Sequence, residues 1–272
     1  MSRLFTGAQA QFIEHDNTLI AGVTTDPRPL SIACWFYPTT NTTRHSIFTN
    51  NFVDDGPGDP GLYVEVNLQT THKLRLYSGG YATNSSTFTF TTNQWHHLCW
   101  TWATGAPGTI SYYLNGGAIG TPTFTWVSGD ETDGAAWGTL VGTSAIPDFV
   151  ARGRLAECSV WDDVLTTAEV VSLAAGVNSM RIRPNALVSY QPVGYGSPEP
   201  ELAPGVGQTG ARTWTIGGTL AIANHAPVSP PFGNDIGIYP PAGAAAVGQP
   251  TMRRWGNVPH MPTTRPQFGR AG

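Results

Sequence analysis

Paired carboxylates are the first chemistry to test, because two of them can hydrolyse a glycosidic bond. In a retaining glycosidase the two groups lie about 5–5.5 Å apart. The best acidic pair on one predicted strand is Glu157 and Asp162, but a spacing of five residues places them on opposite faces of a sheet. Glu65 has no acidic neighbour two residues away. The sequence therefore predicts no enzyme, and a structural hydrogen bond or ion pair for Glu157.

Metal sites are the second possibility. His97 and Cys99 should share a strand face, but no third ligand has a suitable spacing, so a structural role is favoured over zinc. Two acidic loops carry the oxygen ligands that Ca²⁺ prefers, although neither has EF-hand spacing. Their acidic residues are Asp54, Asp55 and Asp59 in one loop and Asp130, Glu131 and Asp133 in the other. Solvated loops without a metal are favoured, Ca²⁺ is the alternative, and no other cofactor is predicted.

Aromatic side chains near turns could stack on sugar rings. The candidates are Trp126, Trp137, Tyr81 and Tyr112, which would have to be exposed. Packing in a core or an interface is the default for all four, and stacking on a sugar is the alternative. Nucleophilic catalysis has no support, because the sequence has no Gly-x-Ser-x-Gly elbow and Cys99 lies between Leu98 and Trp100.

The elements that position these residues must be strands. The chain of 272 residues has 12% charged and 11% aromatic residues, with 32 Gly and 22 Pro. Lys occurs once, whereas Thr, Val and aromatic residues are abundant. Such a composition excludes coiled coils and helical bundles, and it indicates a packed fold with many turns. The net charge of −4 disfavours nucleic-acid binding, and no apolar run is long enough to span a membrane.

Short alternating segments with regular turn signals predict an all-β sandwich or jelly roll. The expected strands are 30–37, 61–68, 73–77, 87–91, 95–102, 109–114, 121–127, 139–142, 154–161 and 186–191. Asn115-Gly116 predicts a type I′ hairpin turn. Thr166-Thr167-Ala168-Glu169 is a capping box that predicts one short helix near 167–175, ended by Gly176.

The last 46 residues differ from the rest. Residues 1–226 carry ten basic and seventeen acidic side chains (−7), whereas residues 227–272 carry four Arg and one Asp (+3). Proline and glycine dominate this segment, so we expect an extended arm that binds neighbouring subunits. The expected contacts are Arg253, Arg254, Arg265 and Arg270, each pairing with acidic groups of a partner.

Three cysteines in apolar surroundings, Cys34, Cys99 and Cys158, are expected to be buried and reduced. The first residues show no apolar segment typical of a secretory signal. Both observations predict synthesis in a reducing cytoplasm.

Six segments in order over about 170 residues resemble the laminin-G-like, concanavalin A-like jelly roll. They are Phe5-Thr6-Gly7 before a first strand at Gln11-Phe12-Ile13, Ser31 to Phe36, Asn93 to Leu98, Tyr113 to Gly116, Gly153 to Trp161 and Leu165 to Val170. The resemblance implies this fold. It also implies Ca²⁺ at the rim in some relatives and, in the glucanase relatives, an acidic motif that is missing here.

The segment Asn185 to Pro192 resembles a strand in proteins of tailed phages, although Gln191 replaces the usual Trp. This resemblance implies a non-enzymatic virion protein, such as a capsid decoration protein, that contacts major capsid or tail subunits and forms homo-oligomers in the particle. A module that binds a host glycan is the alternative, and a polysaccharide hydrolase is a third reading. The expected divisions are a jelly roll at 1–192, an irregular extension with a hairpin around Gly217-Gly218 at 193–226, and the arm at 227–272.

Overall fold

The structure is a computed structural model of the chain. It describes residues 2–6, 11–15, 29–50, 62–68, 71–78, 81–104, 108–124, 134–139, 150–194, 199–200, 202 and 213–228. All of them belong to the first of two compact units, residues 1–233. Among these residues, no helix has the length and apolar character that crossing a membrane requires.

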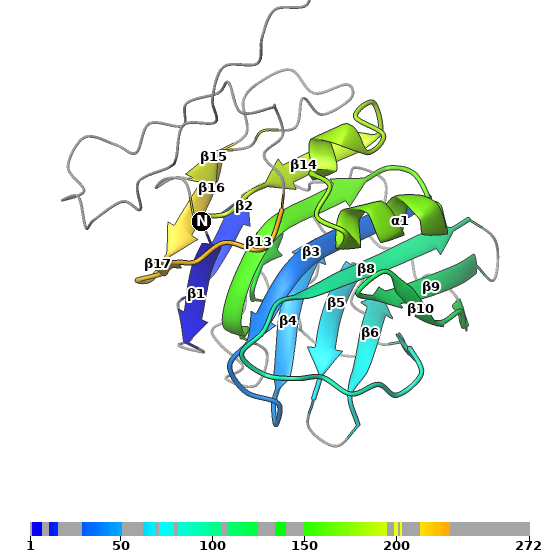
Figure 1. Ribbon diagram of the computed structural model, residues 1–272, viewed down its shortest axis with the longest axis horizontal. Coiled ribbons are helices and arrows are strands. Elements are labelled where there is room, and N and C mark those ends of the chain that lie inside the picture. The colour runs from blue at the N-terminus through cyan, green and yellow to red at the C-terminus, as the bar shows by residue number, and fades with distance from the viewer. Residues whose placement is uncertain are drawn as a thin grey trace, which may run out of the picture. The chain divides into compact units, whose positions relative to one another are not determined.

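Two antiparallel sheets form a sandwich (Figure 1). The first sheet has the order β10-β9-β8-β3-β13-β1-β17, with β11 paired to β9 and β14 paired to β13. Its strands are β1 (Ser2–Thr6), β3 (Leu30–Pro38), β8 (His96–Ala103), β9 (Gly108–Leu114), β10 (Gly117–Gly120), β11 (Thr123–Phe124), β13 (Arg152–Trp161), β14 (Leu187–Gln191) and β17 (Ala221–Ala223).

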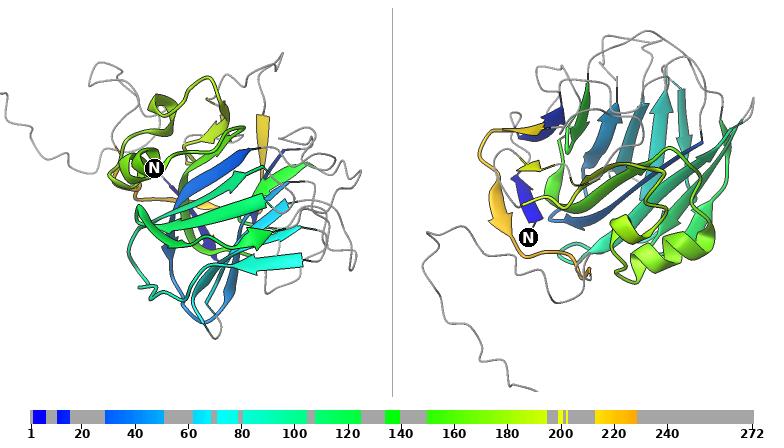
Figure 2. Two further views of the ribbon diagram at one scale, coloured as in Figure 1. Left: turned by 90° about the vertical axis from the view of Figure 1, so that its right-hand side faces the viewer. Right: turned by 90° about the horizontal axis from the view of Figure 1, so that it is seen from above.

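The second sheet has the order β15-β16-β2-β12-β4-β5-β6-β7. Its strands are β2 (Phe12–His15), β4 (Arg44–Asn50), β5 (Leu62–Asn67), β6 (Lys73–Ser78), β7 (Tyr81–Asn84), β12 (Ala135–Trp137), β15 (Glu199–Pro200) and β16 (Thr213–Gly217). The two sheets face each other as layers (Figure 2). This architecture confirms the predicted all-β sandwich.

The core between the sheets follows from the period of two along each strand. On β8, Leu98, Trp100 and Trp102 point into it. On β5 and β6, Val64 and Leu76 do the same from the opposite layer. The alternate residues of each strand therefore lie on the outer faces of the sandwich, and those faces hold the candidate sites.

The outer face of the first sheet is covered by α1 (Thr167–Ala174) and the 3₁₀ turn η2 (Ser179–Arg181) (Figure 1). Val170 and Leu173 of α1 pack with Trp161 and Cys99 in a second apolar cluster. The predicted capping box is present, because Thr166 accepts from the Glu169 amide and Glu169 accepts from the Thr166 amide. The helix thus begins where the sequence predicts.

The predicted hairpin at Asn115-Gly116 is also confirmed. Both residues have positive φ, 51° and 82°, as a type I′ turn requires. The turn joins β9 to β10.

Two strand predictions differ from the structure. Residues 87–91 form no strand, because the amides of Phe88 and Phe90 bond to His72 while the chain crosses from β7 to β8. Of the strand expected at 139–142, the described residue Thr139 lies outside any strand; β12 (Ala135–Trp137) precedes it, followed by Gly138 with φ 83°. Residues 140–142 and 125–127 lie outside the described part.

The predicted hairpin around Gly217-Gly218 is wrong. β16 pairs with β2 in the second sheet, whereas β17 pairs with β1 in the first. The segment between them therefore crosses from one layer to the other. β1 itself precedes the strand at Gln11 to Ile13 that the sequence indicated as the first.

Candidate functional site

Two of the four predicted stacking aromatics are buried. Trp137 and Tyr112 are both fully buried, and the Tyr112 hydroxyl donates to the Thr83 carbonyl at 2.9 Å. Both belong to the core cluster, so the default of core packing is confirmed for them and the alternative of stacking on a sugar is wrong. Trp126 and the Tyr81 side chain lie outside the described residues.

Glu157 has the structural role that the sequence predicts. It is 5% exposed and lies at a bulge of β13 with φ 54°. The Tyr190 hydroxyl and the Asn178 amide donate to its Oε2 at 2.6 and 3.1 Å, and His225 Nε2 lies 2.9 Å from Oε1. These contacts tie η2, β14 and residues 224–228 to the outer face of the first sheet.

The remaining predicted sites fall outside the described residues. They are the two acidic loops and the arginines of the arm. In the part of the chain that the structure describes, no three His, Cys, Asp or Glu side chains are placed to hold a metal ion. His97 and Cys99 do share the outer face of β8, where both are buried.

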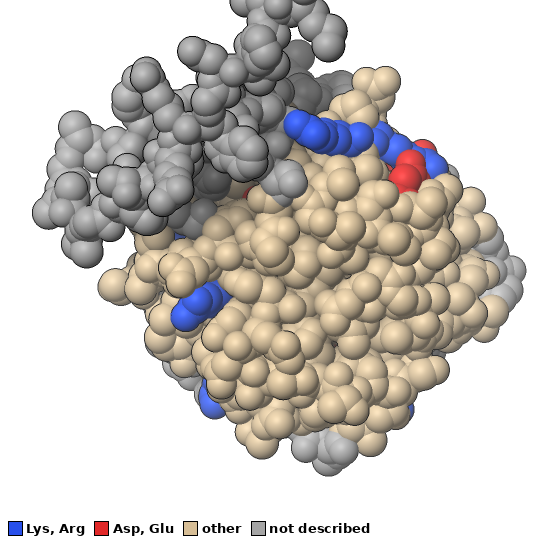
Figure 3. Space-filling view, viewed as in Figure 1, with Lys and Arg blue, Asp and Glu red and all other residues tan. Residues whose placement is uncertain are grey.

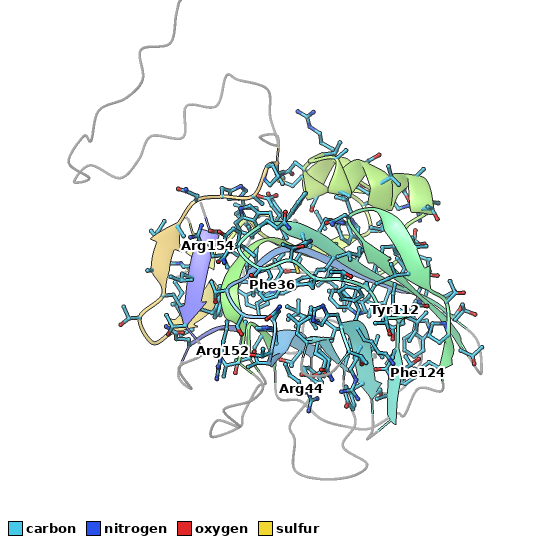
Figure 4. The ribbon with its side chains drawn as sticks, turned by 60° about the horizontal axis from the view of Figure 1, so that its bottom comes forward. Phe36, Arg44, Tyr112, Phe124, Arg152 and Arg154 are labelled. Atoms are coloured by element: carbon cyan, nitrogen blue, oxygen red, sulfur yellow. The ribbon has the colours of Figure 1, made fainter. Side chains whose placement is uncertain are left out.

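A charged cluster that was not predicted from the sequence lies on the outer face of the second sheet. Its centre is Glu65 on β5, which is fully buried. Arg75 of β6 is directly opposite Glu65 in the strand register, and its Nη1 lies 2.8 Å from Oε1. Arg44 of β4 approaches from the other side, with Nε and Nη2 at 2.9 and 2.7 Å from Oε2. Figure 4 shows Arg44 reaching away from the core.

Two tyrosines complete this cluster. The Tyr63 hydroxyl donates to Glu65 Oε2 at 2.5 Å. The Tyr77 ring stacks on that of Tyr63, with 5.5 Å between their centroids, and the Arg75 guanidinium lies 4.6 Å from the Tyr77 centroid. We call Arg44, Tyr63, Glu65, Arg75 and Tyr77 the arginine cluster.

The electrostatics of the cluster hold its charges in place. Burial by itself would lower the pKa of Arg44, but the Glu65 carboxylate, together with Tyr63 and Tyr77, outweighs burial and raises that pKa above its ordinary value. Burial and the same carboxylate raise the pKa of Tyr63, so its hydroxyl stays a donor. Both arginine side chains keep access to solvent, with exposed fractions of 19% for Arg44 and 18% for Arg75.

Further polar side chains border the cluster on the same face. Lys73 is two residues before Arg75 on β6, and Asn67 is directly opposite Lys73 on β5. Asn84 of β7 is opposite Arg75. Lys73 and Asn67 are half-buried and Asn84 is exposed. The outer face of the second sheet therefore offers fixed guanidinium donors beside neutral amides and a lysine.

A smaller cluster lies on the outer face of the first sheet. Trp95 is half-buried, whereas the other six tryptophans with described side chains are buried. Its ring meets Tyr37 edge to face at 5.5 Å, and the Arg154 guanidinium lies 4.5 Å from the Tyr37 centroid. Trp95 and Val228 both pack against the small cluster of Trp35, Ala156 and Ala226, which holds the chain that crosses the sheet.

The arginine cluster did have a signal in the sequence. Alternation along 73–77 and 62–67 places Lys73, Arg75 and Tyr77 on one face, with Tyr63 and Glu65 on the same side of the next strand. Alternation predicts the strands but does not show which strands are neighbours. From the sequence alone, Glu65 is therefore only a carboxylate that has no acidic neighbour two residues away.

Comparison with known proteins agrees with the fold. A laminin-G-type family model of the concanavalin A-like lectin/glucanase superfamily matches residues 11–171. The chain therefore belongs to this superfamily. No curated protein matches its sequence.

Solved structures share the fold at low sequence identity. A candidate carbohydrate-binding protein from Bacteroides ovatus matches with a TM-score of 0.54 and 15% identity, over 81% of this chain and 62% of that one. This chain thus spans less than two thirds of that protein. A heptameric pentraxin from Limulus polyphemus has a TM-score of 0.49 and 20% identity, over 63% of this chain and 78% of that one. A sialidase carbohydrate-binding domain from Ruminococcus gnavus, bound to sialyllactose, has a TM-score of 0.45 and 13% identity, over 62% of this chain and all of that one.

Proposed function

We propose that this domain is a non-catalytic glycan-binding module whose ligand lies on the outer face of the second sheet. The observation that carries the proposal is the arginine cluster, in which Glu65 holds two partly exposed guanidiniums beside the Tyr77 ring. The superfamily and the name of the Bacteroides ovatus neighbour support it.

The chemistry of the cluster suits sugars. A guanidinium presents five planar donors, and a sugar hydroxyl or ring oxygen can accept from them. Glu65 and Tyr77 fix these donors before a ligand arrives, so less side-chain entropy is lost on binding. The neighbouring amides Asn67 and Asn84 can both donate and accept, as neighbouring hydroxyls require.

The same cluster gives no support to hydrolysis. Glu65 is the acidic side chain that the described residues place on this face, and both of its oxygens are engaged. Two carboxylates at a distance of about 5–10 Å are needed for either stereochemical course of glycoside hydrolysis. Binding without cleavage is therefore the activity proposed here.

Affinity electrophoresis against a panel of soluble polysaccharides tests the proposal. The variant Arg75→Met removes the guanidinium while keeping an unbranched side chain beside Tyr77. The matched control is Arg181→Met, which removes an exposed arginine of η2, on the side of the other sheet. We expect the wild type and the control to be retarded by at least one polysaccharide, and the Arg75 variant to bind at least tenfold more weakly.

Two outcomes would refute the proposal. One is that no polysaccharide of the panel retards the wild type. The other is that a folded Arg75→Met protein, checked by its thermal melt, binds as tightly as the control.

Placement on a virion is compatible with this function and remains a prediction. A glycan-binding body would leave the arm, with Arg253, Arg254, Arg265 and Arg270, to bind capsid or tail subunits. The arm lies outside the described residues, so this part of the proposal rests on the sequence.

A further inference from the structure

The outer face of the second sheet carries more positive than negative charge in its described part. Its charged side chains are Arg44, Lys73 and Arg75 against Glu65, which gives +2. Among the described side chains of this face, positive charge therefore dominates around the arginine cluster.

The other acidic groups with described side chains belong to the side of the first sheet. Glu157 is buried beneath residues 224–228, and Asp162 directly follows β13. Asp163 and Glu169 pair with Arg183 beside α1. The face that carries α1 shows few charged side chains in its described part (Figure 3). None of these carboxylates offsets the charge of the arginine cluster.

Glu65 engages only part of the donor capacity around it. The Arg75 guanidinium has five N–H donors, and Glu65 receives a bond from one of them, on Nη1. The Nε–H of Arg75 is buried, and no acceptor for it occurs among the described residues. The donors that remain for a bound anion are therefore the other Nη N–H groups of Arg75, whose side chain is 18% exposed.

The geometry also favours an oxyanion over a neutral group. Guanidinium donors form a fork that matches a carboxylate or a sulfate with two parallel hydrogen bonds. The Tyr77 ring lies against both guanidiniums, 4.6 Å from that of Arg75 and 5.9 Å from that of Arg44, so they are already oriented. Lys73 lies two residues from Arg75, or about 7 Å along the strand, and can pair with the same anionic group or the next one along a polymer.

We infer that the arginine cluster with Lys73 selects anionic glycans, in which a carboxylate or sulfate group on the sugar pairs with Arg75, Arg44 and Lys73. This inference rests on the proposed glycan-binding function and names its ligand class.

Two matched pairs of polymers test the inference. Polygalacturonate is compared with its methyl ester, and dextran sulfate with dextran, so each pair differs in charge on one backbone. We expect the anionic member of at least one pair to bind at least tenfold more tightly than its neutral partner. The pair that shows this preference identifies carboxylate or sulfate. Binding should weaken as NaCl rises from 50 to 500 mM, because salt screens partly exposed charges.

Two variants test whether the preference for anionic glycans arises from the arginine cluster and Lys73. Lys73→Gln changes a half-buried residue at the start of β6, so the fold should persist, and the anionic preference should fall about threefold. Arg75→Lys keeps the charge but loses the fork, and we expect most of the preference to disappear. Arg181→Gln removes one positive charge from another face, as Lys73→Gln does from this one, and it should leave the anionic preference unchanged.

The failures of the inference and of the function can be distinguished. Equal affinity for both members of each pair, with binding that still depends on Arg75, would overturn the anionic preference and leave glycan binding intact. The anionic preference of this face is also overturned if Arg181→Gln weakens anionic binding as much as Lys73→Gln does. Absence of binding to all four polymers and to the whole panel would overturn both.

Discussion

Glu65 is the residue on which the arginine cluster depends. It is fully buried, and its partners Arg44, Arg75 and Tyr63 come from three adjacent strands. A buried carboxylate is tolerated only when it is paired and hydrogen-bonded, which is the case here. Glu65 therefore contributes both to the stability of the fold and to the proposed ligand binding.

Replacing Glu65 by Gln should lower both stability and binding. Gln keeps the shape but leaves two neighbouring guanidiniums without their carboxylate. Because both are partly exposed, we expect a loss of about 2 kcal/mol in the free energy of unfolding, less than for a fully buried pair. Urea unfolding measures it, and Lys73→Gln is the control, with an expected change below about 0.5 kcal/mol. Unchanged stability of Glu65→Gln would mean that the cluster is not held by this charge.

Two buried histidines make stability depend on pH. Burial lowers the pKa of His97 to about 3. Burial also lowers the pKa of His45 to about 4, and the His45 ring accepts from the Arg152 amide through Nδ1. Both must stay neutral in the folded protein. In the unfolded chain each takes up a proton near pH 6.5.

His97→Phe should therefore reduce the acid sensitivity of the protein. As pH falls below about 6.5 the unfolded state binds a proton that the folded state excludes, so stability is lost until pH reaches the folded pKa. The loss from His97 is about 1.4 kcal/mol per pH unit over that window. Between pH 7 and 4.5 the wild type should lose about 2–3 kcal/mol more than His97→Phe, measured by urea unfolding at each pH. Parallel losses in the two proteins would contradict a neutral buried His97.

At the scale of elements, the strap formed by residues 219–228 decides how the first sheet is covered. Gln11 and Arg3 donate to the Thr219 and Leu220 carbonyls, and Ser2 donates to the Asn224 carbonyl. Ala226 then packs on Trp35 and Ala156. At the end of α1 the strap passes so close to Gly176 that an added Cβ would lie 2.4 Å from the Pro227 carbonyl oxygen.

Gly176→Ala should consequently destabilise the domain. Gly176 has φ 89°, which is unfavourable for alanine, and the new methyl group would push the strap away. Together these effects should cost about 2–3 kcal/mol. The matched control is Gly117→Ala on β10, where the nearest atom to an added Cβ is at 3.5 Å. The prediction fails if thermal melts of the two variants coincide.

At the scale of the whole molecule, the described sandwich ends inside the segment first assigned to the arm. Val228 packs against the cluster of Trp35, Ala156 and Ala226, and His225 contacts Glu157, so residues up to 228 are part of the body. A boundary at residue 227 would cut through this packing. The start predicted for the arm therefore moves to residue 229.

Two deletions separate body from arm. Removal of residues 229–272 should leave the melting temperature within about 2 °C, because the described contacts of the sandwich all remain. Removal of residues 219–272 also takes away β17 and the buried residues Leu220 and Ala226, and it should lower the melting temperature by about 5 °C or more. If the shorter deletion already unfolds the protein, the arm contributes to the body. If particles still fully incorporate the protein that lacks residues 229–272, the predicted role of the arm is wrong.

The sequence by itself determined the features whose interactions are local. The capping box at Thr166, the turn at Asn115-Gly116 and most strands follow from side chains a few residues apart, so they could be predicted. Only the tertiary structure decided which strands became neighbours. That choice brings Arg44 and Arg75 to Glu65, buries Trp137 and Tyr112, and sends β16 and β17 to different sheets. Alternation shows which residues share a face, but the sheet order determines what that face meets, because strand neighbours are selected by packing across the whole core.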